Sequence, residues 1–414
     1  MKYDIAVIGA GMVGAAAASL LARSGFSVAV VDSHEPAPFD AAQPVGLRVS
    51  AFSPGSADIL SEAGGWRQVE RQRHCAYRLM VVEDRDESVA LQFDAVEFGL
   101  ERLGTIVENQ LVQWTLWQSL LTLGGVELFC PDRVSGLEYI DGDPAIRLDS
   151  GAEIHCRLLV GADGPDSAVR GLLGIKQEHW EYGQKGLVTV VTTATPNAGM
   201  AWQRFLDGGP LAFLPLDDGT SSIVWSLPGA EADRLLELED AAFLAELNRA
   251  INGGDNHWPD QVLSCGPRAA FPLTMRLSER YWASGAVLMG DAAHVVHPLA
   301  GQGVNLGLLD AAGLVEVLVE AHNKAQDFAA DATLEKYGRW RRSEAEVMAR
   351  GMHGIRGLFM PEELGLLRRF GMNLVASSWM VRDVFIKRAT GRHRNSPALA
   401  RGRALTDLLR SAAG

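Results

Sequence analysis

The chain has 414 residues, of which 47% are hydrophobic and 21% charged, and its formal net charge is −13. This length predicts two or three domains with sizeable cores, and the composition excludes intrinsic disorder as the default state. The acidic charge argues against nucleic acid as a partner. Four scattered cysteines without a CxxC pair argue against a disulfide-stapled secreted scaffold and favour a cytoplasmic protein.

The N-terminal segment predicts a βαβ unit. Residues 3–8 are an apolar, β-branched run typical of a buried strand, residues 15–23 are strong helix formers, and residues 26–31 form a second apolar run. The motif GxGxxG occupies residues 9–14, between the first strand and the helix, and Asp32 follows the second strand. The uncharged stretch here approaches transmembrane length, but its glycines favour a strand, a turn and a helix.

This arrangement is typical of a dinucleotide site, the alternative being a glycine-rich turn kept for packing alone. Gly9 allows the tight turn, Gly11 lets the backbone approach a pyrophosphate, and Gly14 permits close packing of helix against strand. The helix N-terminus offers free N–H groups to the phosphates, and Asp32 accepts hydrogen bonds from a ribose. FAD and NAD fit equally well at this point. The candidate residues of this first junction are Gly9, Gly11, Met12, Val13, Gly14 and Asp32.

The following segment combines loops, strands and a helix. Arg48 comes after a proline-rich loop, where it either contacts the cofactor or is a solvated surface residue. Residues 76–104 predict strands with acidic turns, and residues 110–123 have the periodicity of a helix. Turn residues at 141–142 and 149–151 predict a meander of short strands.

A second glycine–acid junction follows the apolar strand predicted at residues 158–160. Its sequence is Gly161-Ala162-Asp163-Gly164, and the start of a helix comes next. The glycines permit close backbone approach to a ligand, while Asp163 either accepts a hydrogen bond from a ligand hydroxyl or holds the turn. The candidate residues of this second junction are Asp163 and Gly164.

Residues 180–275 predict antiparallel strands interrupted by a helix at residues 240–250. This sheet has the pattern of a domain inserted between pieces of the dinucleotide domain. Its aromatic side chains suit either an apolar pocket for an aromatic substrate or simple core packing. The predicted strands are residues 187–193, 202–205, 211–216 and 221–227.

A third junction follows the strand predicted at residues 285–289. An acid at the strand end precedes a glycine-rich helix N-terminus, which is typical of a second site for a polar ligand. His294 and His297 have HxxH spacing, but without a third ligand nearby they predict capping or packing and no metal site. The candidate residues of this third junction are Gly290, Asp291, Pro298, Gly301, Gln302, Gly303, Val304 and Asn305.

The three junctions, in this order and at these separations, resemble those of the class A flavoprotein aromatic hydroxylases, which have the p-hydroxybenzoate hydroxylase fold. The resemblance covers essentially the whole chain. It implies that the first junction holds the FAD pyrophosphate, that the second serves both FAD and transiently bound NAD(P)H, and that the third contacts the ribitol and isoalloxazine. It also implies a flavin contact at Gln110, beside Asn109, where the wider class often has arginine.

Four stretches are similar to one branch of that family, the ubiquinone-biosynthesis hydroxylases: residues 108–110, 201–205, 209–215 and 337–342. The branch implies an FAD-dependent monooxygenase that uses NAD(P)H and O₂ to hydroxylate the ring of a polyprenylated phenol or quinol. Because the flavin performs the oxidation, no catalytic side chain is expected. The alternatives are a hydroxylase of a soluble aromatic compound, a flavin-dependent reductase or halogenase, and a non-catalytic flavin-binding subunit of a ubiquinone-biosynthesis complex.

The expected fold is α/β, with a Rossmann-like FAD-binding domain, an inserted antiparallel-sheet substrate domain and a helical C-terminal region. The expected FAD-binding parts are residues 1–75, 105–180 and 276–345. The expected substrate parts are residues 76–104 and 181–275, and the C-terminal region is residues 346–414.

Charge is spread unevenly along the chain. From Lys336 to the C-terminus there are 16 Lys and Arg against 6 Asp and Glu, so this end is basic and the remainder acidic. Together with apolar stretches between residues 358 and 385, this predicts contact with a membrane surface or a multiprotein complex, and peripheral attachment of a cytoplasmic protein to the inner face of the membrane. The alternative is a set of arginine-rich helices whose charges pair with the acidic body.

Overall fold

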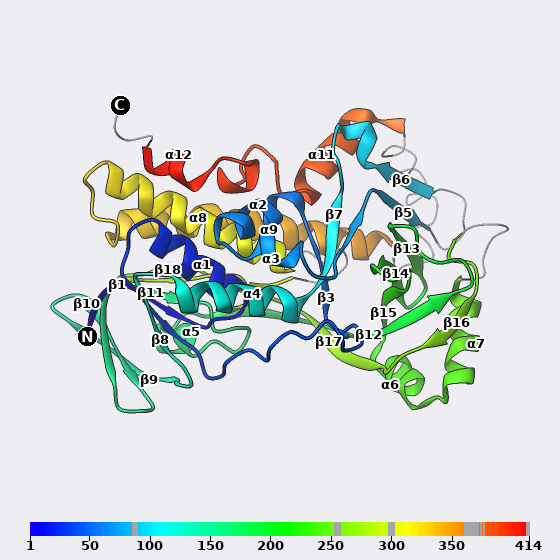
Figure 1. The fold of residues 1–414 in the computed structure, drawn as a ribbon, viewed down its shortest axis with the longest axis horizontal. Coiled ribbons are helices and arrows are strands. Elements are labelled where there is room, and N and C mark those ends of the chain that lie inside the picture. Colours follow the sequence, from blue (N-terminus) through cyan, green and yellow to red (C-terminus); the bar gives the residue numbers. More distant parts are fainter. Residues whose placement is uncertain are drawn as a thin grey trace.

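The computed structural model describes residues 1–84, 90–251, 258–296, 303–359, 372, 375 and 377–410. Within these residues the chain forms three sheets with helices packed against them (Figure 1). All four cysteines are free thiols.

The first sheet is Rossmann-like. Its central strand β1 (Lys2–Ile8) pairs in parallel with β2 (Val28–Val31) on one side and with β11 (Glu153–Gly161) on the other. These strands are mostly apolar because helices and loops cover both faces of the sheet. The remaining strands are β8 (Val126–Phe129) beside β2, β19 (Ala286–Leu288) and β18 (Trp282–Ala283) beside β11, and the meander of β9 (Val134–Ile140) and β10 (Asp143–Leu148).

Parallel pairing brings the three glycine junctions together. The strands β1, β11 and β19 lie side by side and run in the same direction. Each junction follows the carboxyl end of one of these strands. The junctions therefore meet at one edge of the sheet, which is where open α/β sheets bind their ligands.

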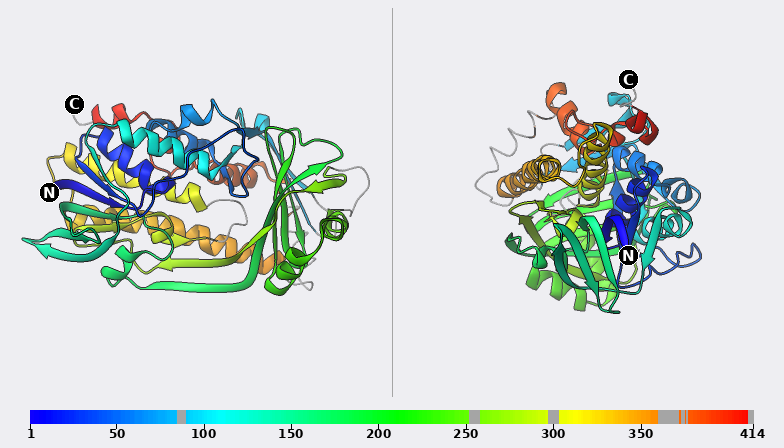
Figure 2. Two further views of the ribbon diagram at one scale, coloured as in Figure 1. Left: turned by 60° about the horizontal axis from the view of Figure 1, so that its bottom comes forward. Right: turned by 90° about the vertical axis from the view of Figure 1, so that its left-hand side faces the viewer.

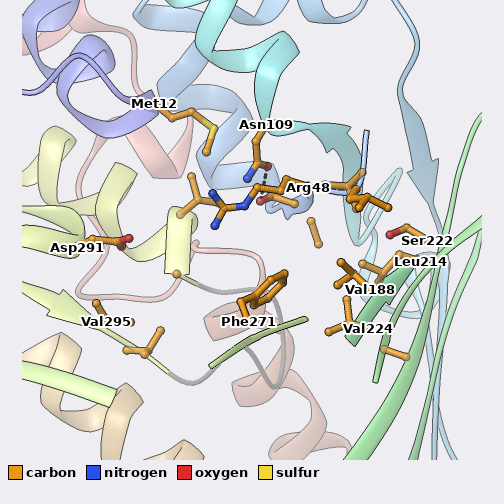
Figure 3. A pocket seen from close by; sticks show the side chains of 18 of the residues that line it. Met12, Arg48, Asn109, Val188, Leu214, Ser222, Val224, Phe271, Asp291 and Val295 are labelled. Atoms are coloured by element: carbon orange, nitrogen blue, oxygen red, sulfur yellow. Dashed lines mark hydrogen bonds between the residues drawn. The ribbon is translucent and has the colours of Figure 1, made fainter. Parts of the chain in front are cut away.

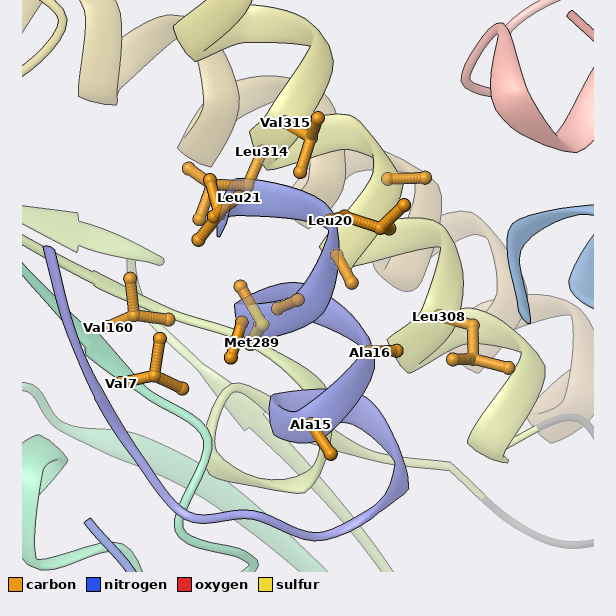
Figure 4. Close-up of a cluster of buried hydrophobic side chains, with 14 of the residues drawn as sticks. Val7, Ala15, Ala16, Leu20, Leu21, Val160, Met289, Leu308, Leu314 and Val315 are labelled. Atoms are coloured by element: carbon orange, nitrogen blue, oxygen red, sulfur yellow. The ribbon is translucent and has the colours of Figure 1, made fainter. Parts of the chain in front are cut away.

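A core of aliphatic side chains joins the first sheet to its helices. Helix α1 (Met12–Arg23) packs against α8 (Gly303–Asn323), and Figure 4 shows Leu20 and Leu21 of α1 beside α8. Residues 15–18 are fully buried alanines, whose small side chains let the two helices approach closely. Burial of each leucine stabilises the fold by roughly 1.5–3 kcal/mol, so this core holds the first and third junctions firmly in place.

A small antiparallel sheet carries the residues between the first two junctions. Arg48 comes directly before its first strand and Asn109 directly after its middle strand, and the Asn109 backbone N–H donates to the Arg48 carbonyl at 3.0 Å. Both residues therefore lie at the same end of the sheet. Its strands are β3 (Val49–Phe52), β7 (Gly104–Glu108) and β4 (Cys75–Tyr77), and the nearby helices are α2 (Pro54–Glu62), α3 (Trp66–Val69) and α4 (Asn109–Thr122).

The largest sheet has nine strands and is antiparallel except where β13 (Met200–Leu206) pairs in parallel with β5 (Leu79–Glu83). Helices α6 (Gly229–Glu237) and α7 (Asp240–Ile251) cover one face and form a second apolar core. The long strands β12 and β17 extend towards the first sheet (Figure 2). The other strands are β6 (Ala90–Asp94), β12 (Gln177–Thr193), β14 (Gly209–Pro215), β15 (Ser221–Pro228), β16 (Val262–Cys265), β17 (Ala269–Ser278) and β20 (His294–Val295).

The C-terminal part of the chain is helical and returns to the first sheet's helices. Helix α9 (Asp331–Phe359) packs against α8, and α11 (Trp379–Ala389) is tied to β6 through Arg382. After α11 the chain reaches α2, and the last helix is α12 (Leu405–Arg410). None of the described helices is both long and apolar enough to cross a membrane.

Candidate cofactor and substrate site

A cavity of about 550 Å³ lies between the carboxyl edge of the first sheet and one face of the nine-stranded sheet (Figure 3). All three glycine junctions contribute to its wall, so the structure brings together segments from distant parts of the sequence. Arg48 and Asn109 also line it, from the small sheet. The junction residues that line it are Gly11, Met12, Val13, Ala162, Gly164, Gly290, Asp291, Gly303 and Val304.

The N-terminus of α1 opens onto this cavity. Gly11 is the N-cap residue, no side chain caps the helix, and its first turn contains no acidic residue. The first N–H groups of a helix have no partner within the helix, and they form the positive end of its dipole. A Cβ atom built on Gly11 would meet no atom within 4 Å. The backbone here is therefore open to a phosphate-bearing ligand.

Gly9 and Gly14 serve packing within the protein. Gly9 has a φ of +101°, and a Cβ atom on it would lie 2.3 Å from the carbonyl oxygen of Ala162. A Cβ atom on Gly14 would lie 1.9 Å from the carbonyl oxygen of Gly9. Neither glycine lines the cavity. Together they fasten the first junction to the second, as the tight turn and the close helix packing require.

Asp32 fastens the first junction at the end of β2. Its Oδ2 accepts a hydrogen bond from the Ala10 backbone N–H at 2.5 Å, and its Oδ1 accepts one from His34 N at 3.1 Å. The carboxylate is half-buried and does not line the cavity.

In the second junction Asp163 holds the turn. Its two oxygens accept hydrogen bonds from the Ser167 hydroxyl and from the Val169 backbone N–H, at the start of α5 (Ala168–Leu172). The cavity wall is formed instead by Ala162 and by Gly164, which has a φ of +86°. The sequence leaves two roles open for Asp163, which are accepting a hydrogen bond from a ligand and holding the turn. The structure shows the second role.

Two further residues of the second junction connect it to the third. A Cβ atom on Gly161 would lie 2.8 Å from the Leu288 side chain, so this glycine allows close packing of β11 against β19. The Arg170 guanidinium donates to the carbonyl oxygens of Ala292 and Pro165, each at 3.0 Å. Burial lowers the pKa of Arg170.

In the third junction Asp291 lies at the cavity wall, within the short 3₁₀ turn η2 (Gly290–Ala292). Its carboxyl group is open to the cavity but surrounded by protein, and burial raises its pKa, which His294 and Arg48 only partly offset. Gly303 and Val304 bring the N-terminus of α8 to the same wall. Three further candidates, Pro298, Gly301 and Gln302, lie outside the described residues, as does His297.

Asn305 is buried away from the cavity and joins α8 to the small sheet. Its Oδ1 accepts from the Ser53 backbone N–H at 2.9 Å, and its Nδ2 donates to the Ala51 carbonyl at 2.8 Å. These bonds fix β3, and therefore the chain next to Arg48, against the start of α8.

A buried ionic cluster beneath the third junction was not predicted from the sequence. The Asp310 carboxylate pairs with His294 Nε2 at 2.5 Å and with Arg341 Nε at 2.8 Å, and it accepts a hydrogen bond from Gly290 N at 3.1 Å. All three side chains are at most 1% exposed. Burial alone would raise the pKa of Asp310, but His294 and Arg341 lower it below its ordinary value. The carboxylate is therefore ionised and holds the Gly290 turn.

Arg48 and Asn109 occupy the middle of the cavity. The Arg48 guanidinium lies 5.9 Å from the centre of the Phe271 ring, and Asn109 Oδ1 accepts from the Ser50 hydroxyl at 2.7 Å. Gln110 points elsewhere, because its amide donates to the Pro38 carbonyl at 3.0 Å in the proline-rich loop. The structure thus places Asn109, and not Gln110, at the cavity wall.

The fold and the site together define a dinucleotide-dependent enzyme of the Rossmann type. A parallel sheet presents two uncapped or glycine-rich helix N-termini to one cavity, with backbone that is open at Gly11 and a carboxyl group at Asp291. These features fit the phosphates and the polar chain of FAD. The wide cavity beyond them leaves room for a flavin ring and a substrate.

The comparisons with known proteins agree with this class. The family model described as "FAD binding domain" matches residues 2–351, and the chain belongs to that family. It is 38% identical over 351 residues to 3-demethoxyubiquinol 3-hydroxylase of Escherichia coli (84% of this chain, 88% of the relative). It is 34% identical over 391 residues to ubiquinone hydroxylase UbiL of Rhodospirillum rubrum (94% of this chain, 89% of the relative).

Two solved structures share the fold. PqsL of Pseudomonas aeruginosa, a probable FAD-dependent monooxygenase, superposes with a TM-score of 0.75 at 24% identity, covering 90% of this chain and all of that one. HpxO of Klebsiella pneumoniae, solved with FAD and uric acid, superposes with a TM-score of 0.71 at 19% identity. The match covers 96% of this chain and 97% of HpxO. The predicted fold class, the resemblance to the flavin hydroxylases and the FAD cofactor are confirmed. The chain is an FAD-dependent monooxygenase.

Proposed function

We propose that this monooxygenase hydroxylates the aromatic ring of a polyprenylated phenol or quinol in ubiquinone biosynthesis, with electrons from NAD(P)H and an oxygen atom from O₂. The observation that carries the proposal is that one cavity joins three dinucleotide-type junctions to a largely apolar sheet wall. Relatives named as ubiquinone hydroxylases, at 38% and 34% identity over most of the chain, support the same substrate class.

The junction residues are proposed to hold FAD along the cavity. The α1 N-terminus with Gly11, Met12 and Val13 would bind the pyrophosphate, Asp32 the ribose, and the third junction the ribitol and ring. The chemistry that FAD supplies when bound is acceptance of two electrons from NAD(P)H and activation of O₂ for oxygen transfer. The protein orients both partners and keeps water out through the apolar wall.

The charged groups at the wall have positioning roles in this proposal. Arg48 and Asp291 are the charged residues among the described lining residues. The Arg48 side chain is exposed at the cavity, where its cation would stabilise negative charge that develops on the flavin or the phenol. No described lining side chain is required as a nucleophile or a metal ligand.

We also propose that FAD and the substrate ring are bound by different parts of the chain. The first sheet, with residues 1–75, 105–180 and 276–345, would bind FAD, and residues 76–104 and 181–275 would bind the substrate ring. This rests mainly on sheet membership, because β5, β6 and most of β12 to β17 form the nine-stranded sheet on the far side of the cavity. The strand β20 and one end each of β12 and β17 join that sheet from the FAD-binding ranges.

The helix α11 is the proposed contact with a membrane. Trp379, Met380, Val384 and Phe385 are 63%, 74%, 55% and 48% exposed, which is unusual for such large apolar side chains. The neighbouring basic residues are engaged, since Arg382 pairs with Glu97 and Arg388 with Glu344. The apolar face, and not free positive charge, would therefore provide most of the contact with lipid.

The test of the proposed function is deletion of the gene followed by mass spectrometry of the accumulated quinone precursor. We expect a prenylated precursor that lacks one ring oxygen, and restoration of the complete quinone by the wild-type gene. An unchanged quinone pool would refute the substrate class. Purified protein that binds FAD but whose flavin is never bleached by NAD(P)H would indicate the non-catalytic subunit instead.

A further inference from the structure

The stretch Ala201–Phe205 of β13 faces two environments. Side chains of a strand alternate between the faces of a sheet. Trp202 packs into the core under α6 and α7, with its ring 5.6 Å from that of Phe213, and Arg204 Nη1 donates to the Ile251 carbonyl at 3.3 Å. Gln203, between them, belongs to the opposite face of the strand and lines the cavity, which Trp202 also borders. Core packing therefore accounts for Trp202 and Arg204 but not for the amide of Gln203.

The wall around Gln203 is apolar. In the sheet register Gln203 lies opposite Ala212, Ala212 opposite Val224, and Val224 opposite Val188. None of these neighbouring side chains can form a hydrogen bond. Gln203 is 8% exposed, and its amide has no hydrogen-bond partner in the part of the chain that the structure describes. The amide is not among the fully enclosed polar atoms that lack a partner, so it opens into the cavity, where a ligand group can pair with it.

Two serines on the same wall are also polar residues that face the cavity with apolar neighbours. Ser222 and Ser226 belong to β15, on either side of Val224, and they are 1% and 3% exposed. Both line the cavity, and neither hydroxyl has a partner among the described residues. Figure 3 shows Ser222 beside Leu214 at the sheet end of the cavity. Three uncharged donor–acceptor groups thus interrupt an otherwise apolar surface.

We infer that Gln203, with Ser222 and Ser226, recognises the oxygen substituents of a neutral phenol or quinol ring, and that this wall discriminates against aromatic carboxylates. An amide and two hydroxyls can both donate to and accept from ring hydroxyl and methoxy groups. The inference deepens the proposed function and rests on it. It also distinguishes between that function and the alternative of a soluble aromatic acid as substrate.

The exclusion of acids follows from where the charges lie. The Arg48 guanidinium points towards Met12 and Asp291, away from Ser222 (Figure 3). The sheet wall itself presents no cationic side chain among the described lining residues. A carboxylate placed there would lose its water without gaining an ionic partner, whereas a neutral hydroxyl would lose much less.

The experiment titrates the FAD-loaded protein with methoxyhydroquinone and with 4-hydroxybenzoate, and follows the change in the flavin absorption spectrum. We expect the neutral ring to bind at least about tenfold more tightly than the acid. The variant Gln203→Met keeps the side-chain volume and removes the amide, so it should weaken binding of the neutral ring by about tenfold. Gln203→Asn should recover part of this loss. The control Gln261→Met makes the same substitution at an exposed residue and should leave the affinity for both probes unchanged.

Flavin content separates misfolding from lost recognition. If Gln203→Met loses its flavin, Ser222→Ala makes the same test with a smaller deletion and should weaken the neutral ring by several-fold. Wild-type binding in both variants would overturn the inference and leave the proposed function intact, and so would equal affinity of the wild type for the two probes. If the wild type retains FAD but oxidises NAD(P)H no faster with either probe or with a prenylated quinol, the proposed function itself fails.

Discussion

Two glycines of the first junction differ in what surrounds their Cα atoms. A side chain on Gly11 would project into the open cavity, whereas a side chain on Gly14 would collide with the Gly9 carbonyl. Both positions belong to the same GxGxxG motif, so the motif alone does not separate binding from packing. The two roles are separated by the surroundings in the folded structure, where backbone lies against Gly14 and open space lies beside Gly11.

This difference predicts opposite outcomes for two substitutions. Gly11→Val should give folded protein that retains little FAD, because the side chain occupies the phosphate approach while loss of the N-cap glycine costs only about 1 kcal/mol. Gly14→Ala should destabilise even the FAD-free protein by about 1–3 kcal/mol through overpacking. Flavin absorbance per protein and thermal unfolding of the FAD-free forms measure both effects. Normal flavin content in Gly11→Val would contradict the assignment of this turn.

At the scale of elements, the local patterns predicted β1, α1, β2 and the glycine junctions well because each signal lies within one short segment. Residues on the sheet wall were not predictable, since Gln203 meets Val224 only through the long-range pairing of β13, β14 and β15. Helix α6 was not predicted, and Pro228 and Gly229 at its start are residues typical of turns. An isolated Asp310 within the apolar run of α8 was the available signal for the buried cluster.

The cluster of Asp310, His294 and Arg341 ties η2, α8 and α9 together, and its removal should loosen all three. Asp310→Asn leaves Arg341 buried without its counter-charge, and we expect a loss of about 3–5 kcal/mol at pH 7. The folded-state pKa of Asp310 is lowered, so its contribution is present above the ordinary aspartate range and fades as the pH falls below about 4.

Urea unfolding at neutral and at acidic pH measures this effect, and the stabilities of the wild type and Asp310→Asn should converge in acid. The control is Asp233→Asn, which removes an exposed partner of Lys185 and should cost at most about 1 kcal/mol. A pH-independent difference between the wild type and Asp310→Asn would mean that the carboxylate charge is not what stabilises the cluster.

At the scale of the whole molecule, the basic C-terminal end pairs with the acidic body. Arg382 reaches Glu97 in η1 (Ala95–Phe98), and Arg392 reaches Asp58 in α2. Lys336 pairs with Glu320 in the same way. For these three residues, folding pairs the positive charge of the C-terminal end with the acidic body, as the interpretation of arginine-rich helices that pair with the body predicts.

Membrane binding should accordingly depend on apolar contact. The double variant Trp379→Ser/Met380→Ser should lower flotation with phosphatidylcholine–phosphatidylglycerol vesicles by at least tenfold, since each side chain contributes roughly 1.5–3 kcal/mol when buried. Val347→Ser, which changes an apolar residue on α9 that is 47% exposed, is the control. Salt raised from about 0.1 M to 1 M screens charges but should leave this binding intact. Vesicle binding lost in high salt would show electrostatic docking instead.

The account as a whole claims that one cavity holds both the FAD and the ring that receives oxygen. Its most direct test is a reaction of the FAD-loaded protein with NAD(P)H, methoxyhydroquinone and isotopically labelled O₂, analysed by mass spectrometry. We predict a ring product that carries one labelled oxygen atom, formed in the wild type and strongly reduced in Gly11→Val. Oxidation of NAD(P)H that yields only labelled peroxide and unchanged ring, for this and for prenylated quinols, would contradict it.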